Sequence, residues 1–324
     1  MTKQADSDSV VWAYRLLLDR EPENRQVVRE WLTKSLDRRG LVQEFLNSPE
    51  FKFTHPRLRF PALSGFEPGM HVDLDLSAAE MESLFRHVQE TWERLGREEP
   101  HYSVITSEFY KPSRIQGNLA EFYDTGRHEC QRLLQTLARN GVDPSQLKTC
   151  LEFGCGVGRI TRWLCGHFDM VYGCDISLAH LGIAREHFAA ERIANAEFSH
   201  LRRVQDIHEL PRVDLVYSIL VLQHNPPPVM RQIIRGFLRA LNPGGIAFFQ
   251  VPTYRAGYVF RLQDYLGGDA REQKMEMHAL PQRQVFEIAR EEGGSVLEVI
   301  EDILTGMVAC QELSNTFIIQ KNAC

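Results

Sequence analysis

The stretch LEFGCGVGR, residues 151–159, decides the fold that we expect for this chain of 324 residues. A strand-like apolar run precedes the stretch, and a helical pattern follows it. Glycine accepts backbone conformations that other residues avoid, so such a turn is tight and lets backbone N–H groups approach a ligand closely. The stretch therefore predicts a ligand-binding turn between a buried strand and a helix.

Two classes of cofactor are bound by turns of this kind. Dinucleotide-binding folds use G-x-G-x-x-G, in which a final Gly or Ala lets the helix approach the sheet. Here that final position holds the bulky Arg159, and the pattern is E-x-G-x-G-x-G. This pattern resembles the first motif of class I S-adenosylmethionine-dependent methyltransferases. The resemblance implies S-adenosylmethionine as cofactor, held by these residues: Glu152, Gly154, Cys155, Gly156, Gly158 and Arg159.

Glu152 is the residue that separates the two classes. In the family that the turn resembles, the acidic residue before the first glycine helps to hold the amino-acid end of the cofactor. A carboxylate suits that end because the methionine part presents an ammonium group beside a cationic sulfonium, whereas a carboxylate would repel a diphosphate. Simpler alternatives stay open: Glu152 on the surface, Arg159 exposed on a helix, Cys155 merely small, and glycines that only shape a turn.

A second acidic motif follows at a matching distance. The stretch VYGCDIS ends a strand with Asp175, which stands 21 residues after Gly154. The resemblance implies that Asp175 accepts both ribose hydroxyls, with Ile176 beside it. NAD enzymes use the same device and a helix cap is the simpler reading, so Asp175 alone does not discriminate. The resemblance also places Asp206 at the adenine amino group and Gln223 at the cofactor.

Strand-like and helix-like segments alternate from residue 148 onward. Such alternation predicts a parallel doubly wound sheet, and two late strands without a full helix between them predict a hairpin with one antiparallel strand. We expect the α/β class: a doubly wound, mostly parallel, seven-stranded sheet with a small N-terminal all-α module. The expected strands are 148–153, 170–174, 196–200, 213–221, 245–251, 295–302 and 314–320, and the expected helices between them are about 159–168, 178–190 and 227–241.

The first part of the chain predicts a separate helical module. Apolar residues recur there at helical spacing in three short stretches. The runs AYRLLLDREP and FLNSPEF resemble a bacterial helical module of unassigned function that often sits beside glycosyltransferases. A linker rich in Pro and Gly follows, and then a capping box at Ser77 opens a helix. We expect a helical module at 1–57, a linker and capping helix at 58–99, and an S-adenosylmethionine-binding methyltransferase domain at 100–324.

His224 is the expected catalytic residue. It follows the fourth strand of the expected sheet, at the edge where ligands of open α/β sheets bind, and a neutral imidazole there can take a proton from an acceptor. The alternative, that His224 or Gln223 anchors the cofactor or a loop, stays open. An aromatic acceptor pocket is expected from His101, Tyr123, Tyr254 and His278, although packing of a lid is the simpler reading of each.

Composition, charge and motifs argue against several classes of binding partner. The net charge of −6 argues against nucleic-acid binding, and Asn225-Pro226-Pro227-Pro228 lacks the aromatic residue that DNA amino methyltransferases carry in a similar motif. No run approaches the ~18 apolar residues of a membrane helix. The first residues do not resemble a signal peptide, so we expect a cytoplasmic protein without membrane insertion. The seven cysteines form no CxxC pair, and His180 and His187 lie too far apart to share an ion, so we expect no metal and no disulfide framework.

The expected activity is methylation of an oxygen on a small molecule or a glycan. The glycan preference rests only on the proteins beside which the N-terminal module is found. N-methylation of a small metabolite is one alternative, and a noncatalytic cofactor-binding or scaffold protein is another. The sequence indicates neither the acceptor nor the oligomeric state.

Overall fold

The protein is described by a computed structural model that covers residues 3–55, 63, 65–267, 275–302, 304–305 and 312–323, apart from the side chains of Pro49, Lys52 and Phe53. The chain divides into two compact units. Unit 1 comprises Met1–Glu67 with Gly306–Glu312, and unit 2 comprises Pro68–Thr305 with Leu313–Cys324. The expected boundary at residue 57 lies outside the described residues. The expected boundary at residue 100 falls inside unit 2, so the helix before it belongs with the sheet.

Unit 1 is helical, as the sequence predicts. Its core contains Val10, Leu41 and Phe45, all fully or almost fully buried, and the Trp31 ring stacks on Phe45 with 4.6 Å between centroids. A short fourth helix, which the sequence did not predict, follows the three expected ones. The helices are α1 (Ser7–Leu18), α2 (Arg25–Thr33), α3 (Arg38–Asn47) and α4 (Pro49–Thr54).

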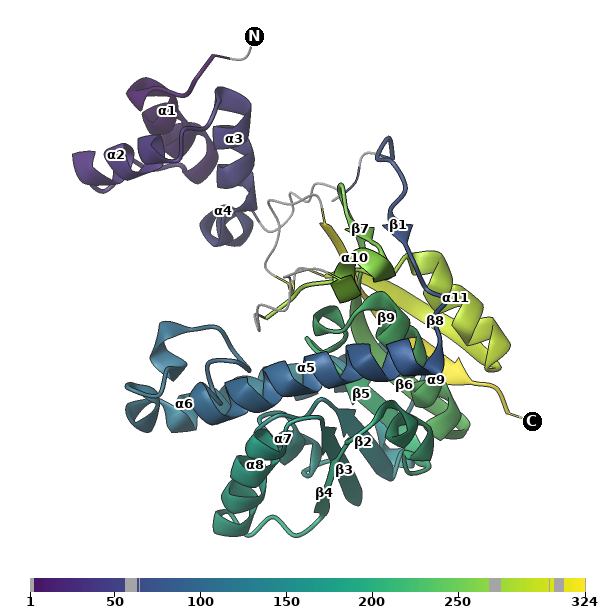
Figure 1. Ribbon diagram of the computed structural model, residues 1–324. Helices are drawn as coiled ribbons and strands as arrows, with labels where there is room; N and C mark the ends of the chain where they lie inside the picture. The colour runs from purple at the N-terminus through teal and green to yellow at the C-terminus, as the bar shows by residue number, and fades with distance from the viewer. Residues whose placement is uncertain are drawn as a thin grey trace. The chain divides into compact units, whose positions relative to one another are not determined.

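Unit 2 is built on a seven-stranded sheet in the order β4-β3-β2-β5-β6-β9-β8 (Figure 1). The pairs β4–β3, β3–β2, β2–β5 and β5–β6 are parallel, whereas β8 and β9 are antiparallel. The expected doubly wound, mostly parallel sheet with a terminal hairpin is therefore confirmed. The strands are β2 (Thr149–Phe153), β3 (Met170–Asp175), β4 (Ala196–His200), β5 (Val213–Ser218), β6 (Leu241–Arg255), β8 (Gly294–Asp302) and β9 (Glu312–Lys321), and a separate pair joins β1 (His71–Val72) to β7 (Val259–Phe260).

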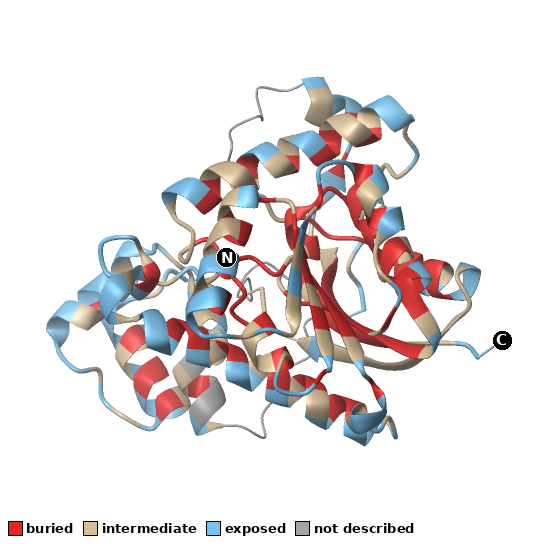
Figure 2. Ribbon diagram, turned by 90° about the horizontal axis from the view of Figure 1, so that it is seen from below, coloured by how far each residue is buried: buried red, intermediate tan, exposed pale blue. Residues whose placement is uncertain are grey.

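Helices cover both faces of the large sheet. Successive residues of a strand point to opposite faces, so Cys150 belongs to the core beneath α6 and α7, and Leu151 belongs to the core beneath α9 and α11. Figure 2 shows the resulting pattern, with largely buried strands between helices whose outer faces are exposed. The helices of unit 2 are α5 (Ala78–Glu98), α6 (Leu119–Arg139), α7 (Thr161–Leu164), α8 (Leu178–Ala190), α9 (Pro227–Ala240), α10 (Leu262–Gly267) and α11 (Gln282–Glu291).

Short 3-10 helices occupy several connections, and the two that follow β4 and β5 lie at the carboxyl ends of the strands. They are η1 (Glu108–Tyr110), η2 (Ile115–Gly117), η3 (Pro144–Gln146), η4 (Val204–Glu209) and η5 (Leu222–His224). The strand β5 ends at Ser218, earlier than the sequence predicts. Leu220 takes a left-handed backbone conformation with φ of 61°, which turns the chain out of the sheet toward η5.

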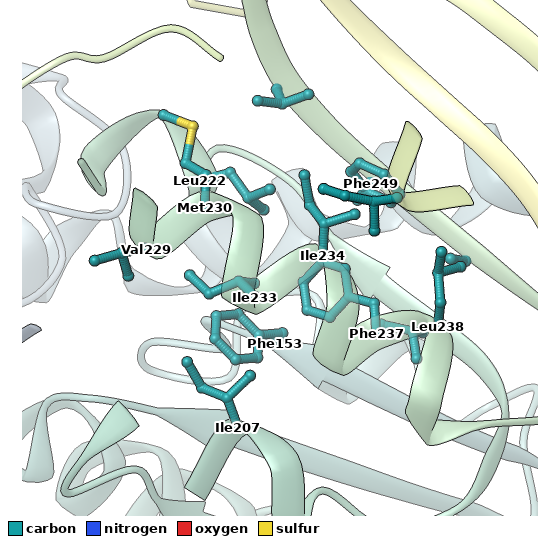
Figure 3. Close-up of a cluster of buried hydrophobic side chains, with 14 of the residues drawn as sticks. Phe153, Ile207, Leu222, Val229, Met230, Ile233, Ile234, Phe237, Leu238 and Phe249 are labelled. Atoms are coloured by element: carbon teal, nitrogen blue, oxygen red, sulfur yellow. The ribbon is translucent and has the colours of Figure 1, made fainter. Parts of the chain in front are cut away.

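The apolar face of α9 packs into one of the two cores that cover the faces of the sheet (Figure 3). The Phe237 ring packs edge-on against Phe153 at 5.1 Å and lies 5.7 Å from Phe249, so one helix contacts β2 and β6 together. Pro227 and Pro228 open this helix, where their missing N–H groups need no partner. The packing fixes the position at which the chain leaves β5.

Phe237→Ala should destabilise the protein by about 3–5 kcal/mol, because it removes a fully buried ring and leaves a cavity between α9 and the sheet. The midpoint and slope of urea denaturation measure this change. Phe109→Ala provides a matched control, since the Phe109 side chain is exposed, and it should change stability by less than about 0.5 kcal/mol. Equal effects of the two substitutions would contradict the packing described here.

Candidate cofactor site

The glycine turn after β2 is shaped by three glycines with positive φ, Gly154, Gly156 and Gly158. A Cβ added at Gly154 would lie 2.4 Å from a methyl group of Val221, and one added at Gly158 would lie 2.7 Å from the Phe188 ring. These short distances leave no room for a Cβ atom at Gly154 or Gly158. The two glycines are therefore needed for close packing as well as for their backbone conformation. The turn is closed against β3, because the backbone N–H of Gly154 donates to the carbonyl of Cys174 at 2.8 Å.

A cavity of about 340 Å³ opens beside this turn, at the carboxyl ends of β2, β3 and β5. Its walls come from the strand ends, from α5, and from three connecting segments that are distant in sequence. The lining residues are Phe85, Trp92, Ser103–Thr106, Glu152–Gly156, Arg159, Ile160, Asp175, Ile176, His180, Leu201, Ile219–Val221, Gln223–Asn225, Ile233, Met275, Met277, Leu304 and Thr305. All the predicted cofactor residues except Gly158 and Asp206 are among them.

Asp175 joins the two strand ends that border the cavity. One carboxylate oxygen accepts the backbone N–H of Gly156 at 2.8 Å, and the other accepts that of Ser177 at 2.8 Å. Because a carboxylate offers about four acceptor positions, both oxygens can still accept from a ligand. The bond to Gly156 holds the glycine turn of β2 against the end of β3.

Glu152 is buried at the end of β2, not exposed as the simpler reading supposed. Its carboxylate accepts a hydrogen bond from the Thr161 hydroxyl. Burial raises the pKa of Glu152 to about 8, and the nearby Asp175 adds to the rise, while the Thr161 bond and Arg159 oppose it. A cationic ligand beside Glu152 would favour the ionised carboxylate.

Arg159 is also buried rather than exposed on a helix. One of its terminal nitrogens donates to the Thr125 hydroxyl at 3.1 Å, whereas its buried Nε has no partner in the described part of the chain. A buried guanidinium N–H without an acceptor is costly, and Arg159 lines the cavity. The side chain is therefore placed to hold an anionic group of a ligand.

His224 and Gln223 lie on η5, directly after the exit of β5. The Nδ1 atom of His224 lies 2.8 Å from the backbone carbonyl of Glu276 and must donate to it. The Nε2 atom is then the acceptor, and the Gln223 amide donates to it at 3.2 Å. Burial lowers the pKa of His224 to about 4, so the ring is a neutral and weak base. This geometry favours the anchoring alternative for His224, whose side chain lines the cavity.

Asp206 does not line the cavity. Its carboxylate accepts the backbone N–H of Arg202 at 2.8 Å and the Arg203 guanidinium at 3.0 Å, so it closes the local turn before η4. Leu201 reaches the cavity instead. The structure therefore does not bring Asp206 to the position that the family resemblance implied, because a hydrogen bond four residues away in the chain occupies its carboxylate.

The four predicted acceptor residues also lie outside the lining of the cavity. His101 packs edge-on against the Phe122 ring, the Tyr123 hydroxyl donates to the carbonyl of Val157, and the Tyr254 hydroxyl donates to the carbonyl of Pro68. The imidazole of His278 lies 2.8 Å from the Tyr258 hydroxyl and 2.9 Å from the Glu276 carboxylate. The first three hold loops through contacts with neighbouring backbone or rings, as the simpler reading supposed.

Several lining residues were missed by the sequence analysis. Phe85 and Trp92 come from α5, which the capping box at Ser77 did reveal, but which was assigned to a linker region. The Trp92 ring lies 5.1 Å from that of His224. Met275, Met277 and Leu304 come from connections after β6 and β8, where no local pattern marked them.

The described residues contain no group of three or more side chains suited to hold a metal ion. Among the helices described, none combines the length and the apolar composition of a membrane span. The cysteines within the described ranges are free thiols, and burial raises the pKa of the Cys155 thiol well above its usual range, which makes it a poor nucleophile. Cys310 and Cys324 lie outside the described residues.

Glu152→Gln should change how stability depends on pH. The pKa of Glu152 is about 8 in the folded protein against an ordinary value of 4.5, so between these values the folded state keeps a proton that the unfolded state releases. The wild-type protein therefore loses stability as pH rises through this window, and the variant lacks that loss. The stability of the variant relative to wild type should rise by an amount on the order of a few kcal/mol between about pH 5 and about pH 8 in urea denaturation.

Glu121→Gln, which changes an exposed carboxylate on α6, should follow the wild-type curve. A constant difference between Glu152→Gln and wild type across the pH range would refute the buried, protonated state of Glu152.

His224 should remain neutral, with its proton on Nδ1, at all pH values above about 5, because burial lowers its pKa to about 4. Nitrogen NMR of histidine-labelled protein reports both the tautomer and the charge, and the spectrum of His224→Gln assigns the resonances. A titration near the ordinary histidine value of about 6.5 would show that the ring is not enclosed as described.

Comparison with known proteins agrees with this geometry. Residues 151–247 match a protein family described as a methyltransferase domain. Ubiquinone biosynthesis O-methyltransferase of Acinetobacter baylyi is 30% identical over 104 residues, covering 32% of this chain and 42% of the relative. The enzyme of the same name from Pseudomonas paraeruginosa is 31% identical over 102 residues, covering 31% and 43%. The chain thus spans less than half the length of these curated relatives.

Solved structures share the fold. Magnesium protoporphyrin IX methyltransferase of Synechocystis PCC 6803, with bound S-adenosylhomocysteine, has a TM-score of 0.50 at 17% identity, covering 72% of this chain and 98% of the other. The same protein with bound S-adenosylmethionine has a TM-score of 0.50 at 16% identity, covering 78% and 100%. The order of the strands and the solved structures thus show the class I methyltransferase fold, and residues 151–247 within it match a methyltransferase domain.

Proposed function

We propose that this chain transfers the methyl group of S-adenosylmethionine to an oxygen of an acceptor molecule. The observation that carries the proposal is a pair of buried carboxylates, Glu152 and Asp175, that line one cavity at adjacent strand ends. A cation beside Glu152 favours its ionised form and is then attracted by two carboxylates, whereas a diphosphate would be repelled. A ligand with hydroxyls at one end and an ammonium group at the other satisfies both.

Each end of the cofactor finds suitable groups in the cavity. Asp175 has acceptor positions free for ribose hydroxyls beyond its two backbone bonds. Glu152 would accept the ammonium group, and the unpartnered Nε of Arg159 would donate to the carboxylate of the methionine part. Ile176 and Leu201 follow β3 and β4 and would lie against the faces of the adenine ring.

S-adenosylmethionine, which Glu152, Arg159 and Asp175 would hold, would supply an activated methyl group. The acceptor oxygen would receive this group and lose its hydroxyl proton. The protein must hold the acceptor in line with the methyl group and exclude water. Trp92 on α5 and the segment Ser103–Thr106 close the cavity over the strand ends and serve the second purpose.

His224 is the proposed recipient of the hydroxyl proton through its Nε2 atom, once the acceptor displaces the Gln223 amide that donates to this atom at 3.2 Å. Its pKa of about 4 is too low for it to ionise a hydroxyl group before transfer. A protonated ether is a far stronger acid than a hydroxyl, however, so the same lone pair can take the proton while the carbon–oxygen bond forms. The hydrogen bond from Nδ1 to the Glu276 carbonyl fixes the tautomer that this role needs.

The curated relatives are O-methyltransferases by name, which supports an oxygen acceptor. A small molecule is the proposed acceptor class, with a glycan as the alternative that the N-terminal module suggested. N-methylation and a noncatalytic cofactor-binding role are the alternatives. In an acceptor screen, a methylated amine would indicate the first, and cofactor binding without any product would indicate the second. The absence of a metal requirement and a cytoplasmic location remain predictions.

Asp175→Asn should weaken S-adenosylmethionine binding about 10- to 100-fold in titration calorimetry, because it removes charge from a hydrogen bond to the ribose. Asp206→Asn is the matched control: it makes the same change at a carboxylate outside the cavity, and it should alter the affinity less than about twofold. Equal losses in the two variants would overturn the placement of the ribose. Failure of the wild-type protein to bind S-adenosylmethionine would overturn the proposed function.

A further inference from the structure

The helix α5 brings a polar side chain to the exits of β3 and β4. Phe85 and Trp92 of this helix line the cavity, and Gln89 lies four residues after the first and three before the second. Residues at these spacings share one face of a helix. Gln89 therefore leaves α5 on the face that borders the cavity, although it lies outside residues 151–247, which match the methyltransferase domain.

The amide of Gln89 connects the two strand exits. Its Nε2 atom donates to the carbonyl of Leu201 at 2.9 Å and, through a longer bond of 3.4 Å, to the carbonyl of Ile176. Ile176 follows β3, Leu201 follows β4, and both line the cavity. Because both partners are carbonyl groups, which only accept, the nitrogen of the amide must face them. The orientation of the amide is thereby fixed.

The oxygen of the same amide is left to accept a hydrogen bond. A glutamine amide has two N–H donors and one acceptor oxygen, and the carbonyl groups of Ile176 and Leu201 use the donors. In the part of the chain that the structure describes, the Oε1 atom of Gln89 accepts from no other group. Toward a ligand this side chain therefore offers an acceptor and no donor.

Other acceptors near these strand exits are already engaged. The Asp206 carboxylate, which the sequence placed at the adenine amino group, instead binds the backbone N–H of Arg202 and the side chain of Arg203. The carbonyl of Ile176 accepts from Nε2 of His200 at 3.1 Å as well as from Gln89. The Gln89 oxygen is thus the side-chain acceptor best placed to replace Asp206.

A free acceptor at this position distinguishes one class of purine from another. The amino group at C6 of adenine donates hydrogen bonds, whereas the oxo group at C6 of hypoxanthine only accepts them. An oxo group facing the Gln89 oxygen would lose its hydrogen bond to water and gain none from the protein, which is costly. An amino group in the same place would be satisfied.

We propose that Gln89 selects the base of the cofactor: its Oε1 atom accepts from the amino group of a 6-aminopurine that lies between Ile176 and Leu201. The proposal rests on the proposed function, because it specifies how S-adenosylmethionine is recognised at that site. The two bonds from Nε2 position the acceptor by tying α5 to both strand exits. Gln89 determines specificity for the base and takes no part in the transfer of the methyl group.

The test compares the binding of two ligands by titration calorimetry. The probes are S-adenosylhomocysteine and S-inosylhomocysteine, which carries an oxo group in place of the 6-amino group. The wild-type protein should bind S-adenosylhomocysteine at least about tenfold more tightly. Equal affinities, or a preference for S-inosylhomocysteine, would overturn the inference and leave the proposed function intact. If the wild-type protein bound neither S-adenosylmethionine nor S-adenosylhomocysteine, the proposed function would be overturned instead.

Two variants separate recognition of the base from support of the fold. Gln89→Leu removes the acceptor and the donors, whereas Gln89→Lys removes the acceptor and keeps a donor for the carbonyl of Leu201. In both variants the preference for S-adenosylhomocysteine should fall below about threefold. The ratio of the two affinities is the decisive quantity, because a purely structural defect would weaken both ligands alike.

Gln135→Leu is the matched control, since Gln135 is an exposed glutamine on α6, and it should keep the wild-type preference. Gln89→Lys guards against misfolding of Gln89→Leu, and the preference of the wild-type protein tests the inference without any substitution. A preference that stayed at the wild-type ratio in either Gln89 variant would overturn the assignment of the base to Gln89.

Discussion

The hydrogen bonds of the Asp175 carboxylate are the constraint on which the site depends. They connect the glycine turn after β2 to the start of α8 through the backbone N–H groups of Gly156 and Ser177. The turn itself has little freedom, because its glycines pack against Val221 and Phe188. One buried carboxylate thereby sets the edge of the cavity, and burial, with a smaller contribution from Asp175, raises the pKa of Glu152 beside it. The fold thus buries a carboxyl group at a cost to its ionised form, and a cationic ligand beside it would stabilise that form.

The local features of this arrangement were predictable from the sequence. A strand followed by Gly154, Gly156 and Gly158 can form only a tight turn, and Asp175 at the end of the next strand must lie at the same sheet edge. The alternation of strands and helices predicted the doubly wound sheet for the same reason: each step depends on residues near one another in the chain. The burial of Glu152 and Arg159 did not follow from these steps, because the sequence left exposed alternatives open for both.

The parts that escaped prediction depend on contacts between distant segments. The helix α5 contributes Phe85 and Trp92 more than 40 residues before the glycine turn, and its Gln89 amide donates to the carbonyl of Leu201 at 2.9 Å. Glu93 of the same helix accepts the N–H of Ala179 in the first turn of α8. The predicted contact of Asp206 with adenine escaped for the opposite reason. A hydrogen bond from the backbone of the nearby Arg202 holds its carboxylate in a local turn. No pattern in a single segment reveals which of these outcomes will occur.

The same helix explains why unit 2 begins before residue 100. Its Gly96 lies so close to α8 that an added Cβ would meet the Ser177 hydroxyl at 2.5 Å and His180 Nδ1 at 2.6 Å. Close packing there places Trp92 over His224, while η5 and the segment Met275–His278 hold His224 from the other side. Segments from α5 and from the connection before α11 therefore meet at one neutral imidazole, so the strands alone do not position the groups around His224.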